Sequence, residues 1–242
     1  MSVSFDFTDH VALVTGATGA LGSAVCEAFA DAGATVAAAD VVAPDDEDAR
    51  LDADRERIHF YEGDFTDEEA VERVVAEVVD DHASLDSLAN VAGTWRGGSP
   101  VAETDADTFD FLFDVNLKTA FLASKHALPH LRESGSDDER GAIVSVSARS
   151  SLEGGEGDSL YRASKAGVRL LTESIAEEES GDVRANAVMP SVIDTPANRE
   201  MMPDADHAKW VDPADIARTV LALCSDATAV TSGAAVPVYG EA

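Results

Sequence analysis

A glycine turn between an apolar strand and an apolar helix constrains the fold of this chain more than any other feature. The apolar run Val11 to Val14 is followed by Thr-Gly-Ala-Thr-Gly-Ala-Leu-Gly, which ends at Gly22. Glycines let a backbone approach a pyrophosphate, and a helix start offers free N–H groups to an anion. Three spaced glycines alone are weak evidence for dinucleotide binding, but a strand before them and a helix after them make that evidence stronger. The turn predicts a dinucleotide site at Gly16, Thr18, Gly19, Ala20, Leu21 and Gly22, and the alternative is a tight turn that binds nothing.

Short apolar runs alternate with helical patterns along all 242 residues. Strands are expected at 10–15, 34–40, 58–61, 85–91, 143–146, 183–189 and 234–238. Helices between them include one long helix at 105–132. Such alternation is typical of a parallel sheet covered by helices on both faces. Because there is no internal repeat and no linker, we expect a single α/β domain over residues 1–242, with a Rossmann-type, doubly wound parallel sheet of about seven strands.

The charge balance argues against two classes of partner. The chain has 47 Asp and Glu against 17 Lys and Arg, a formal net charge of −30, which repels nucleic acid and anionic membranes. No apolar run reaches the roughly 18 residues of a membrane span, and residues 1–6 do not resemble a secretory signal. The two cysteines, Cys26 and Cys224, predict buried thiols. We expect a cytoplasmic protein whose acidic surface resembles those of halophilic proteins, in which concentrated salt screens the repulsion.

Two carboxylates at strand ends indicate which dinucleotide binds. Asp40 closes the second expected strand, where a carboxylate accepts the ribose hydroxyls of NAD and repels the extra phosphate of NADP. No Arg or Lys follows until Arg50, so we expect nothing local to offset that repulsion. The predicted cofactor is NAD(H). Asp64, at the end of the third strand, either meets the adenine amino group or caps the next helix.

Tyr161 and Lys165 carry the predicted chemistry. They lie one turn apart in an expected helix at 159–178 and share one face of it. An ammonium beside a phenol favours the phenolate and lowers the pKa of the tyrosine, which suits a general acid and base. A Tyr and a Lys at this spacing, with no other motif in the chain, are usually surface residues without a joint function. Together with the dinucleotide turn, the pair predicts a redox active site.

In order along the chain, these motifs resemble the short-chain dehydrogenase/reductase family, and the resemblance covers essentially the whole sequence. The family implies a seven-stranded doubly wound sheet, with Tyr161 as the acid and base and Lys165 on the nicotinamide ribose. It also implies that Asn116 helps to hold a proton-relay water. Further matching positions, implied to stabilise the sheet or bind the cofactor, are Asn90, Ala92, Gly93, Pro190, Ile193 and Thr195.

Two positions depart from the family pattern. Ala20 stands where short members usually have glycine, and Ala148 stands where they usually have a serine, thirteen residues before the tyrosine. Neighbours on a strand point to opposite faces, so Ser147 replaces that serine only if the strand bulges. Ser150 and Ser151 are loop alternatives. Losing such a donor costs around 10²–10³ in rate where the reaction requires it.

The substrate-side loops are expected at about 93–103, 148–158 and 190–212. The stretches 91–98, 147–154, 194–199 and 202–206, with Trp210, are similar to those of dihydropteridine reductases, a group within the family that also lacks the serine. A quinonoid pterin accepts hydride without an isolated carbonyl to polarise, so a tyrosine acid could suffice. Trp95 either stacks on a flat ring or packs on the core, and Met201 is a further substrate-side candidate. Asn116 counts against this narrower resemblance, because that group does not keep the asparagine.

Two classes of function follow from the sequence. The leading one is an NAD(H)-dependent oxidoreductase acting on a small carbonyl, hydroxy or quinonoid substrate. The other is a non-catalytic NAD-binding redox sensor, which Ala148 permits and which Tyr161, Lys165 and Asn116 argue against. No metal site is predicted, because no His, Cys and carboxylate cluster has the necessary spacing. Helices apolar on more than one face, at 107–132 and 159–178, predict a homodimer or homotetramer.

Overall fold

The computed structural model describes residues 4–134 and 140–241. Within these residues, seven parallel strands form one sheet in the order β3-β2-β1-β4-β5-β6-β7. The strands are β1 (Val11–Thr15), β2 (Thr35–Asp40), β3 (Ile58–Glu62), β4 (Ser87–Asn90), β5 (Gly141–Val146), β6 (Val183–Pro190) and β7 (Ala235–Val238). The predicted fold class, an α/β doubly wound parallel sheet with helices on both faces, is confirmed.

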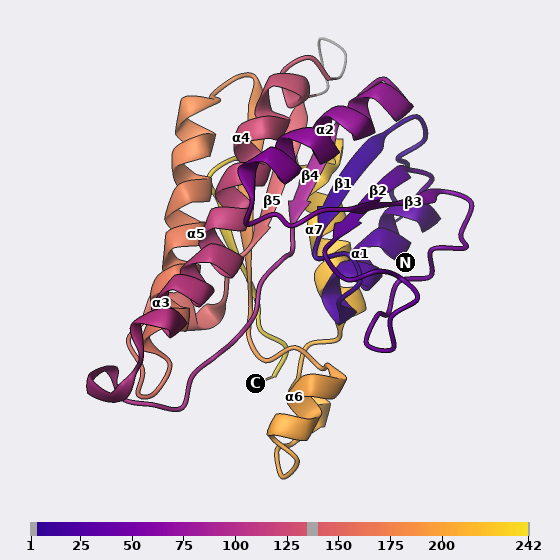
Figure 1. Cartoon of the computed structure of the whole chain (residues 1–242). Helices are drawn as coiled ribbons and strands as arrows, with labels where there is room; N and C mark the ends of the chain where they lie inside the picture. The colour runs from indigo at the N-terminus through magenta and orange to yellow at the C-terminus, as the bar shows by residue number, and fades with distance from the viewer. Residues whose placement is uncertain (1–3, 135–139, 242) are drawn as a thin grey trace.

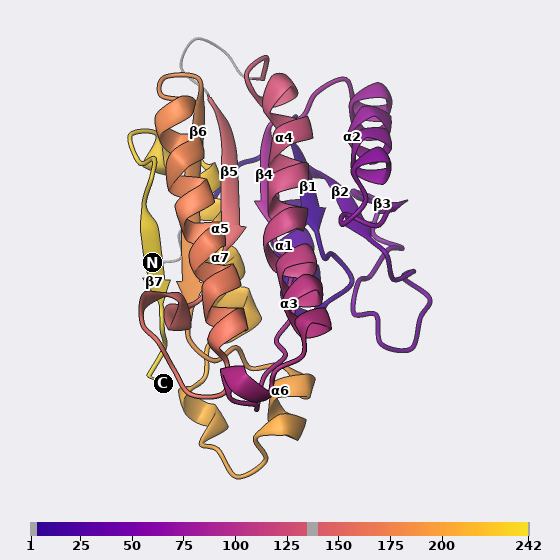
Figure 2. The ribbon, with the colours of Figure 1, turned by 60° about the vertical axis from the view of Figure 1, so that its left-hand side comes forward.

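Helices cover both faces of the sheet, as Figures 1 and 2 show. One face carries α1 (Ala20–Asp31) and α7 (Pro213–Cys224), and the other carries α2 (Glu68–His82), α4 (Thr119–Leu131) and α5 (Ser159–Glu178). Successive strand residues serve opposite faces. Val14 belongs to the core beneath α1 and α7, and Leu13 to the core beneath α2 and α4. Because both faces of the sheet are covered, successive residues of these strands are apolar in the sequence.

The expected long helix at 105–132 is helical without a break from Ala106 to Leu131, but it consists of three segments. The helix α3 (Ala106–Phe113) passes into a π-helical turn, Asp114–Lys118, before α4 begins. The three segments follow one another without a break, so the sequence showed one helical stretch and did not reveal the π turn within it. The remaining helical segments are α6 (Pro196–Met201) and short 3₁₀ turns at Val101–Glu103, Arg149–Leu152, His207–Lys209 and Asp226–Thr228.

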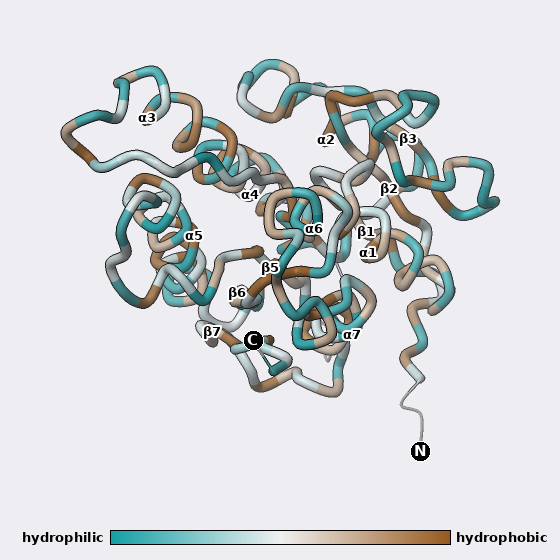
Figure 3. Tube along the Cα trace, turned by 90° about the horizontal axis from the view of Figure 1, so that it is seen from below, coloured by the Kyte–Doolittle hydropathy of each residue, from teal (hydrophilic) through white to brown (hydrophobic). Residues whose placement is uncertain are grey.

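The order of strands places a crevice at the carboxyl ends of β1 and β4. Strand β1 pairs with β2 on one side and with β4 on the other, so the connections after β1 and β4 diverge. Ligands bind at such a switch point in open α/β sheets. Thr15 Oγ1 accepts hydrogen bonds from the backbone N–H groups of Val91 (3.1 Å) and Ala92 (3.2 Å), which fixes the two strand ends together. Figure 3 looks towards this edge, with α6 nearest the viewer.

Within residues 4–134 and 140–241, no helix combines the length and the apolar character needed to cross a membrane.

Candidate functional site

A cavity of about 740 Å³ occupies the crevice and collects most of the predicted dinucleotide residues. It extends from Asp40 and Asp64 towards Gly93 and Thr195. The predicted residues that border it are Gly16, Thr18, Gly19, Ala20, Leu21, Gly22, Asp40, Asp64, Ala92, Gly93 and Thr195. Sequence reasoning missed Arg50, Val115, Thr119 and Glu200, which border the same cavity and belong to no recognisable motif.

Two glycines of the turn, Gly16 and Gly22, are each required because a side chain there would clash with nearby backbone. Gly16 has φ +65°, and a Cβ there would lie 2.7 Å from the Cα of Ala92. A Cβ on Gly22 would lie 1.9 Å from the carbonyl oxygen of Gly16. Gly19, the N-cap of α1, has no side-chain cap, and a Cβ there would make only an ordinary contact, 3.5 Å from Gly16 O. The first turn of α1 therefore offers its N–H groups to an anion in the cavity.

Asp40 is held rigidly at the edge of this cavity. Its Oδ2 accepts hydrogen bonds from Thr18 N (3.0 Å) and Oγ1 (2.7 Å). Its Oδ1 accepts from the N–H groups of Val41 (2.7 Å) and Val42 (3.2 Å). The carboxylate is thus oriented before any ligand arrives. The glycine turn, the open helix end and this carboxylate together fit the phosphates and adenosine ribose of a nicotinamide dinucleotide.

Arg50 borders the same cavity as Asp40. The acidic segment after β2 folds back so that Arg50 N donates to Thr18 O (2.7 Å). Arg50 and Asp40 consequently border the same cavity, although ten positions separate them in sequence. The expectation that nothing local offsets the repulsion by Asp40 stays a prediction, with Arg50 as the basic residue that borders the same cavity.

Asp64 stabilises a turn while bordering the cavity. Its Oδ1 accepts hydrogen bonds from Thr66 N (2.9 Å) and Thr66 Oγ1 (2.7 Å). The N-cap position of α2 belongs to Asp67 instead. Asp64 therefore does not cap the helix, and its contact with the adenine amino group stays a prediction.

A second cavity, of about 620 Å³, lies beside the first and shares Leu21, Val91 and Gly93 with it. Predicted residues on its walls are Trp95, Ser147, Ala148, Tyr161, Lys165, Pro190, Ile193 and Met201. The helix α6 and the residue before it divide the two spaces: Thr195 and Ala197 border the first cavity, and Asn198 and Met201 the second. The candidate acid and base thus lie where a nicotinamide ring and a substrate could meet.

Lys165 and Asn116 lie together beneath Gly93. Lys165 is buried, and its Nζ donates to the Val146 carbonyl (2.9 Å). A Cβ on Gly93 would lie 2.7 Å from that Nζ and 2.9 Å from Asn116 Oδ1, so a side chain at this position would displace the Lys165 or Asn116 side chain. Asn116, in the π turn, accepts from Thr94 N (2.7 Å) and donates to Thr94 O (3.0 Å) and Ser164 Oγ (3.0 Å). The π turn thereby fixes the start of the loop after β4.

The pKa of Tyr161 is shifted opposite to the sequence prediction. Burial raises the pKa of Tyr161 to about 12, and the charge of Asp158 adds to the rise. Burial lowers the pKa of Lys165 to about 8. Burial and the negative charge of Asp158 both disfavour the phenolate, and the ammonium of Lys165 donates to a backbone carbonyl. Tyr161 is therefore a neutral phenol at neutral pH and can donate a proton.

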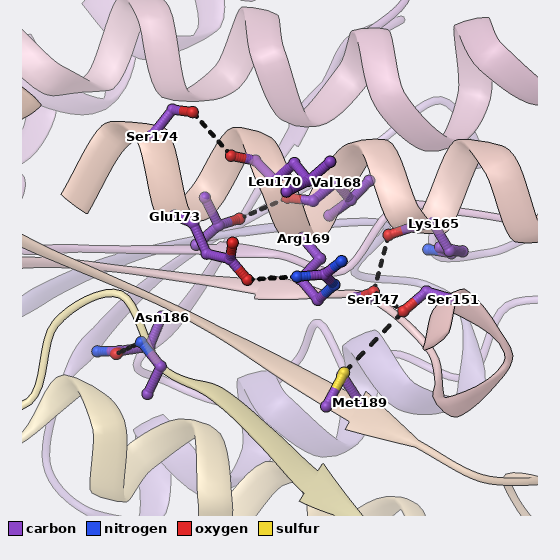
Figure 4. A network of polar contacts seen from close by, with 12 residues as sticks. Ser147, Ser151, Lys165, Val168, Arg169, Leu170, Glu173, Ser174, Asn186 and Met189 are labelled. Carbon is purple, nitrogen blue, oxygen red and sulfur yellow. Dashed lines mark hydrogen bonds and ion pairs between the residues drawn. The ribbon is translucent and has the colours of Figure 1, made fainter. Parts of the chain in front are cut away.

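Ser147 directs its hydroxyl into the protein (Figure 4). Its Oγ donates to the carbonyl of Lys165 (2.8 Å) and lies 3.2 Å from Ser151 Oγ. Both serines are buried, and Ser151 Oγ lies 4.0 Å from Met189 Sδ. The hydroxyl of Ser147 thus joins β5 to α5, and no bulge turns it towards a substrate. Ser150 is the loop serine that borders the second cavity.

Asn90 acts within the sheet. It is buried, and its Nδ2 donates to Ser124 Oγ (3.1 Å) and Ser145 Oγ (3.3 Å), which ties β4 to α4 and β5. It is not among the residues that border either cavity. Over the described part of the chain, no group of three or more His, Cys, Asp or Glu side chains could hold a metal ion.

The parallel sheet, the glycine turn at its switch point and the paired Tyr161 and Lys165 define a Rossmann-type oxidoreductase. Comparison with known proteins gives the family: the family model for short chain dehydrogenases matches residues 10–206. The chain belongs to the short-chain dehydrogenase family.

Named relatives span nearly the whole chain. Cis-4-hydroxycyclohexanecarboxylate dehydrogenase of Sinomonas cyclohexanicum is 33% identical, covering 97% of this chain and 96% of its own. Meso-2,3-butanediol dehydrogenase of Serratia marcescens is 31% identical, covering 98% and 95%. The ligand-free aldohexose dehydrogenase of Thermoplasma acidophilum has a TM-score of 0.84 at 26% identity, covering 97% and 94%. None of these three is a dihydropteridine reductase, so they give no support to the narrower resemblance predicted from the substrate-side loops.

Proposed function

We propose that the chain is an NAD(H)-dependent oxidoreductase acting on a small carbonyl, hydroxy or quinonoid substrate. The observation that carries this proposal is the contact between the two cavities. Tyr161 and Lys165 border the second cavity, which shares Leu21, Val91 and Gly93 with the dinucleotide cavity. A nicotinamide coenzyme, when bound, supplies or accepts the hydride. The protein's own residues bind the coenzyme, orient the substrate and move the proton.

The proton step belongs to Tyr161. With a pKa of about 12, the phenol is protonated at neutral pH and gives its proton to the substrate atom that becomes negative during reduction. Lys165, fixed by the Val146 carbonyl, is positioned to bind the nicotinamide ribose. Thr195 and Ile193 are the candidates for the carboxamide. Tyr161→Phe should lower turnover about 10²–10⁴-fold and leave the Kd for NADH unchanged. Unchanged turnover would remove Tyr161 as the acid.

We infer a preference for NAD(H) over NADP(H) from the fixed carboxylate of Asp40. Its four hydrogen bonds keep a negative charge at the ribose end of the cavity, where a 2′-phosphate would be repelled. Fluorescence titration should give a Kd for NADH at least about tenfold below that for NADPH, which corresponds to 1.4 kcal/mol. Arg50→Gln tests the opposing charge and should weaken NADPH more than NADH. Equal affinities in the unmodified protein would refute the preference.

The proposed substrate class follows from Ala148, which borders the same cavity as Tyr161. Ala148 has no hydroxyl, and the hydroxyl of Ser147 donates to Lys165 O. Trp95 borders the cavity with 42% of its surface exposed, so an aromatic face is available to a flat ring. These features favour a quinonoid, pterin-like acceptor, as in dihydropteridine reductase, over a ketone that needs polarisation.

A substrate panel separates the two classes. Quinonoid dihydropteridine should be reduced faster than small ketones, sugars or acyl thioesters. Ala148→Ser should raise ketone turnover and leave pterin turnover nearly unchanged. The reverse ranking would favour an ordinary keto or hydroxy substrate. NADH binding without oxidation on the whole panel would instead indicate a non-catalytic redox sensor.

We also propose a homodimer or homotetramer that packs through the outer side of α3, α4 and α5. Phe109, Phe121 and Leu170 are 45%, 47% and 53% exposed there, more apolar surface than a solvated helix face usually carries. Light scattering after size exclusion in concentrated salt should give a multiple of 25.3 kDa, and a monomer would refute it. A cytoplasmic location and a salt-rich environment stay predictions from composition.

A further inference from the structure

Arg162 follows the candidate acid in sequence, but its side chain lies in the loop between β5 and α5. Its Nε donates to Asp158 Oδ1 (2.6 Å). Its Nη1 lies within hydrogen-bonding distance of the carbonyls of Glu153 (3.1 Å), Gly154 (3.3 Å) and Ser150 (3.5 Å). One guanidinium therefore contacts four positions of a nine-residue stretch, and its rigid fork suits this use.

Gly155 indicates how closely the loop wraps this group. A Cβ on Gly155 would lie 2.2 Å from Arg162 Cζ and 2.3 Å from its Nε and Nη2. The neighbouring Gly154 faces open space, and a Cβ there would meet nothing within 4 Å. The guanidinium thus packs directly on the backbone at 155, and the neighbouring glycines form a matched pair in which a Cβ meets the guanidinium only at Gly155.

The same loop supports the loop after β4. Gly98 N donates to Gly157 O (2.7 Å). A Cβ on Gly97 would lie 2.8 Å from Gly157 O and 2.8 Å from Cζ2 of Trp95. The indole of Trp95 therefore rests against a segment that is itself bonded to the loop held by Arg162. Trp95, Glu153, Asp158 and Arg162 all border the substrate cavity.

We propose that Arg162 is a positioning residue that sets the shape of the substrate cavity by holding residues 150–158, and through them Trp95, in one arrangement. It moves no proton and touches no residue of the dinucleotide cavity. Asp158 fixes the guanidinium from the start of α5, at a separation of four residues, and the three carbonyls fix the loop to the guanidinium. The effect of Arg162 on substrate binding rests on the proposed function, whereas its effect on the arrangement of the loop does not.

The first test needs no substrate. In a Trp210→Phe background, Trp95 is the single tryptophan, so acrylamide quenching reports its exposure directly. Arg162→Met and Gly155→Ala should each raise the quenching constant about twofold through local opening, and Arg162→Lys should fall between. Gly154→Ala should change nothing. Arg132→Met removes an arginine that pairs with Glu179 near the other end of α5, and it controls for general loss of stability.

The second test separates binding from chemistry. On the best substrate of the panel, Arg162→Met and Gly155→Ala should raise KM about tenfold, or 1.4 kcal/mol, with a smaller change in kcat and an unchanged Kd for NADH. Gly154→Ala should leave all three constants as they are. Unaltered quenching in both Arg162→Met and Gly155→Ala would overturn the proposal. Altered quenching in a protein that oxidises no NADH would support the loop arrangement while refuting the proposed function.

Discussion

Replacing Asn116 by alanine would test whether the π turn positions the active site. The Asn116 side chain is buried and makes three hydrogen bonds, two of them to the backbone of Thr94. In Asn116→Ala, Thr94 N–H and C=O lose their partners. Ser164 Oγ keeps its bond to Tyr161 O (2.8 Å), so it is not left unpaired. The change therefore detaches the loop after β4 from the helix that precedes α4.

The magnitude follows from the two backbone groups left unpaired. Each costs about 1–3 kcal/mol when buried, and Thr94 is half-buried, so we expect a loss of about 2–3 kcal/mol in the free energy of unfolding. In a chain of this length that corresponds to a fall in Tm of about 4–12 °C. Because Asn116 Oδ1 and Lys165 Nζ lie against the same glycine, kcat should also fall about 10–100-fold through misplacement.

Asn186→Ala is the matched control. Asn186 is fully buried in β6, donates to Thr231 O (3.0 Å) and accepts from Ala234 N (3.0 Å), and it borders neither cavity. Both variants would be followed by thermal unfolding and by NADH oxidation at saturating cofactor. Both should lose similar stability, and only Asn116→Ala should lose turnover beyond what its unfolded fraction explains. Equal kinetic losses, or unchanged turnover in Asn116→Ala, would refute the reasoning.

Three further outcomes are expected. Gly22→Ala places a Cβ 1.9 Å from Gly16 O and should lower the free energy of unfolding by about 3 kcal/mol or more. Gly19→Ala should change it by no more than about 1 kcal/mol in urea unfolding. Similar losses in the two variants would contradict the turn geometry. Burial lowers the pKa of Lys165 from 10.5 to about 8, so between these pH values the unfolded chain holds a proton that the folded one has released. Stability should then rise with pH in that window by up to about 3 kcal/mol, and Lys165→Met should lack the rise. Arg184 is buried and donates to Leu223 O (2.6 Å) and Cys224 O (3.0 Å) at the end of α7. Arg184→Met should lower the free energy of unfolding in urea by about 2–4 kcal/mol. A smaller loss would mean that water replaces these hydrogen bonds.

Periodicity and turn chemistry predicted the sheet and most of its helices. Buried parallel strands are apolar on both faces, so runs such as Val11–Thr15 are visible without any structure. The turn from Gly16 to Gly22 was likewise predictable, because two of its glycines are required by contacts of less than 3 Å. That Tyr161 and Lys165 border the same cavity followed from their helical spacing.

Three features of the site were not predictable from spacing. The return of Arg50 to the cavity depends on how an acidic loop folds, and loops carry no periodic signal. The inward hydroxyl of Ser147 depends on a carbonyl of α5, eighteen positions away in sequence. The raised pKa of Tyr161 depends on burial by residues from several segments. Each is set by tertiary contacts that no local pattern encodes.

The neighbourhood of β1 and β4 has a consequence for the chain as it leaves the ribosome. The contacts that join these strands span about 75 residues, as between Val11 and Asp86, while β2 and β3 are made in between. At roughly 5–20 residues per second, one side of β1 waits about 4 s or longer for its partner. An unpaired strand edge invites association with other chains, and mutual repulsion among these acidic nascent polypeptides opposes it throughout that interval.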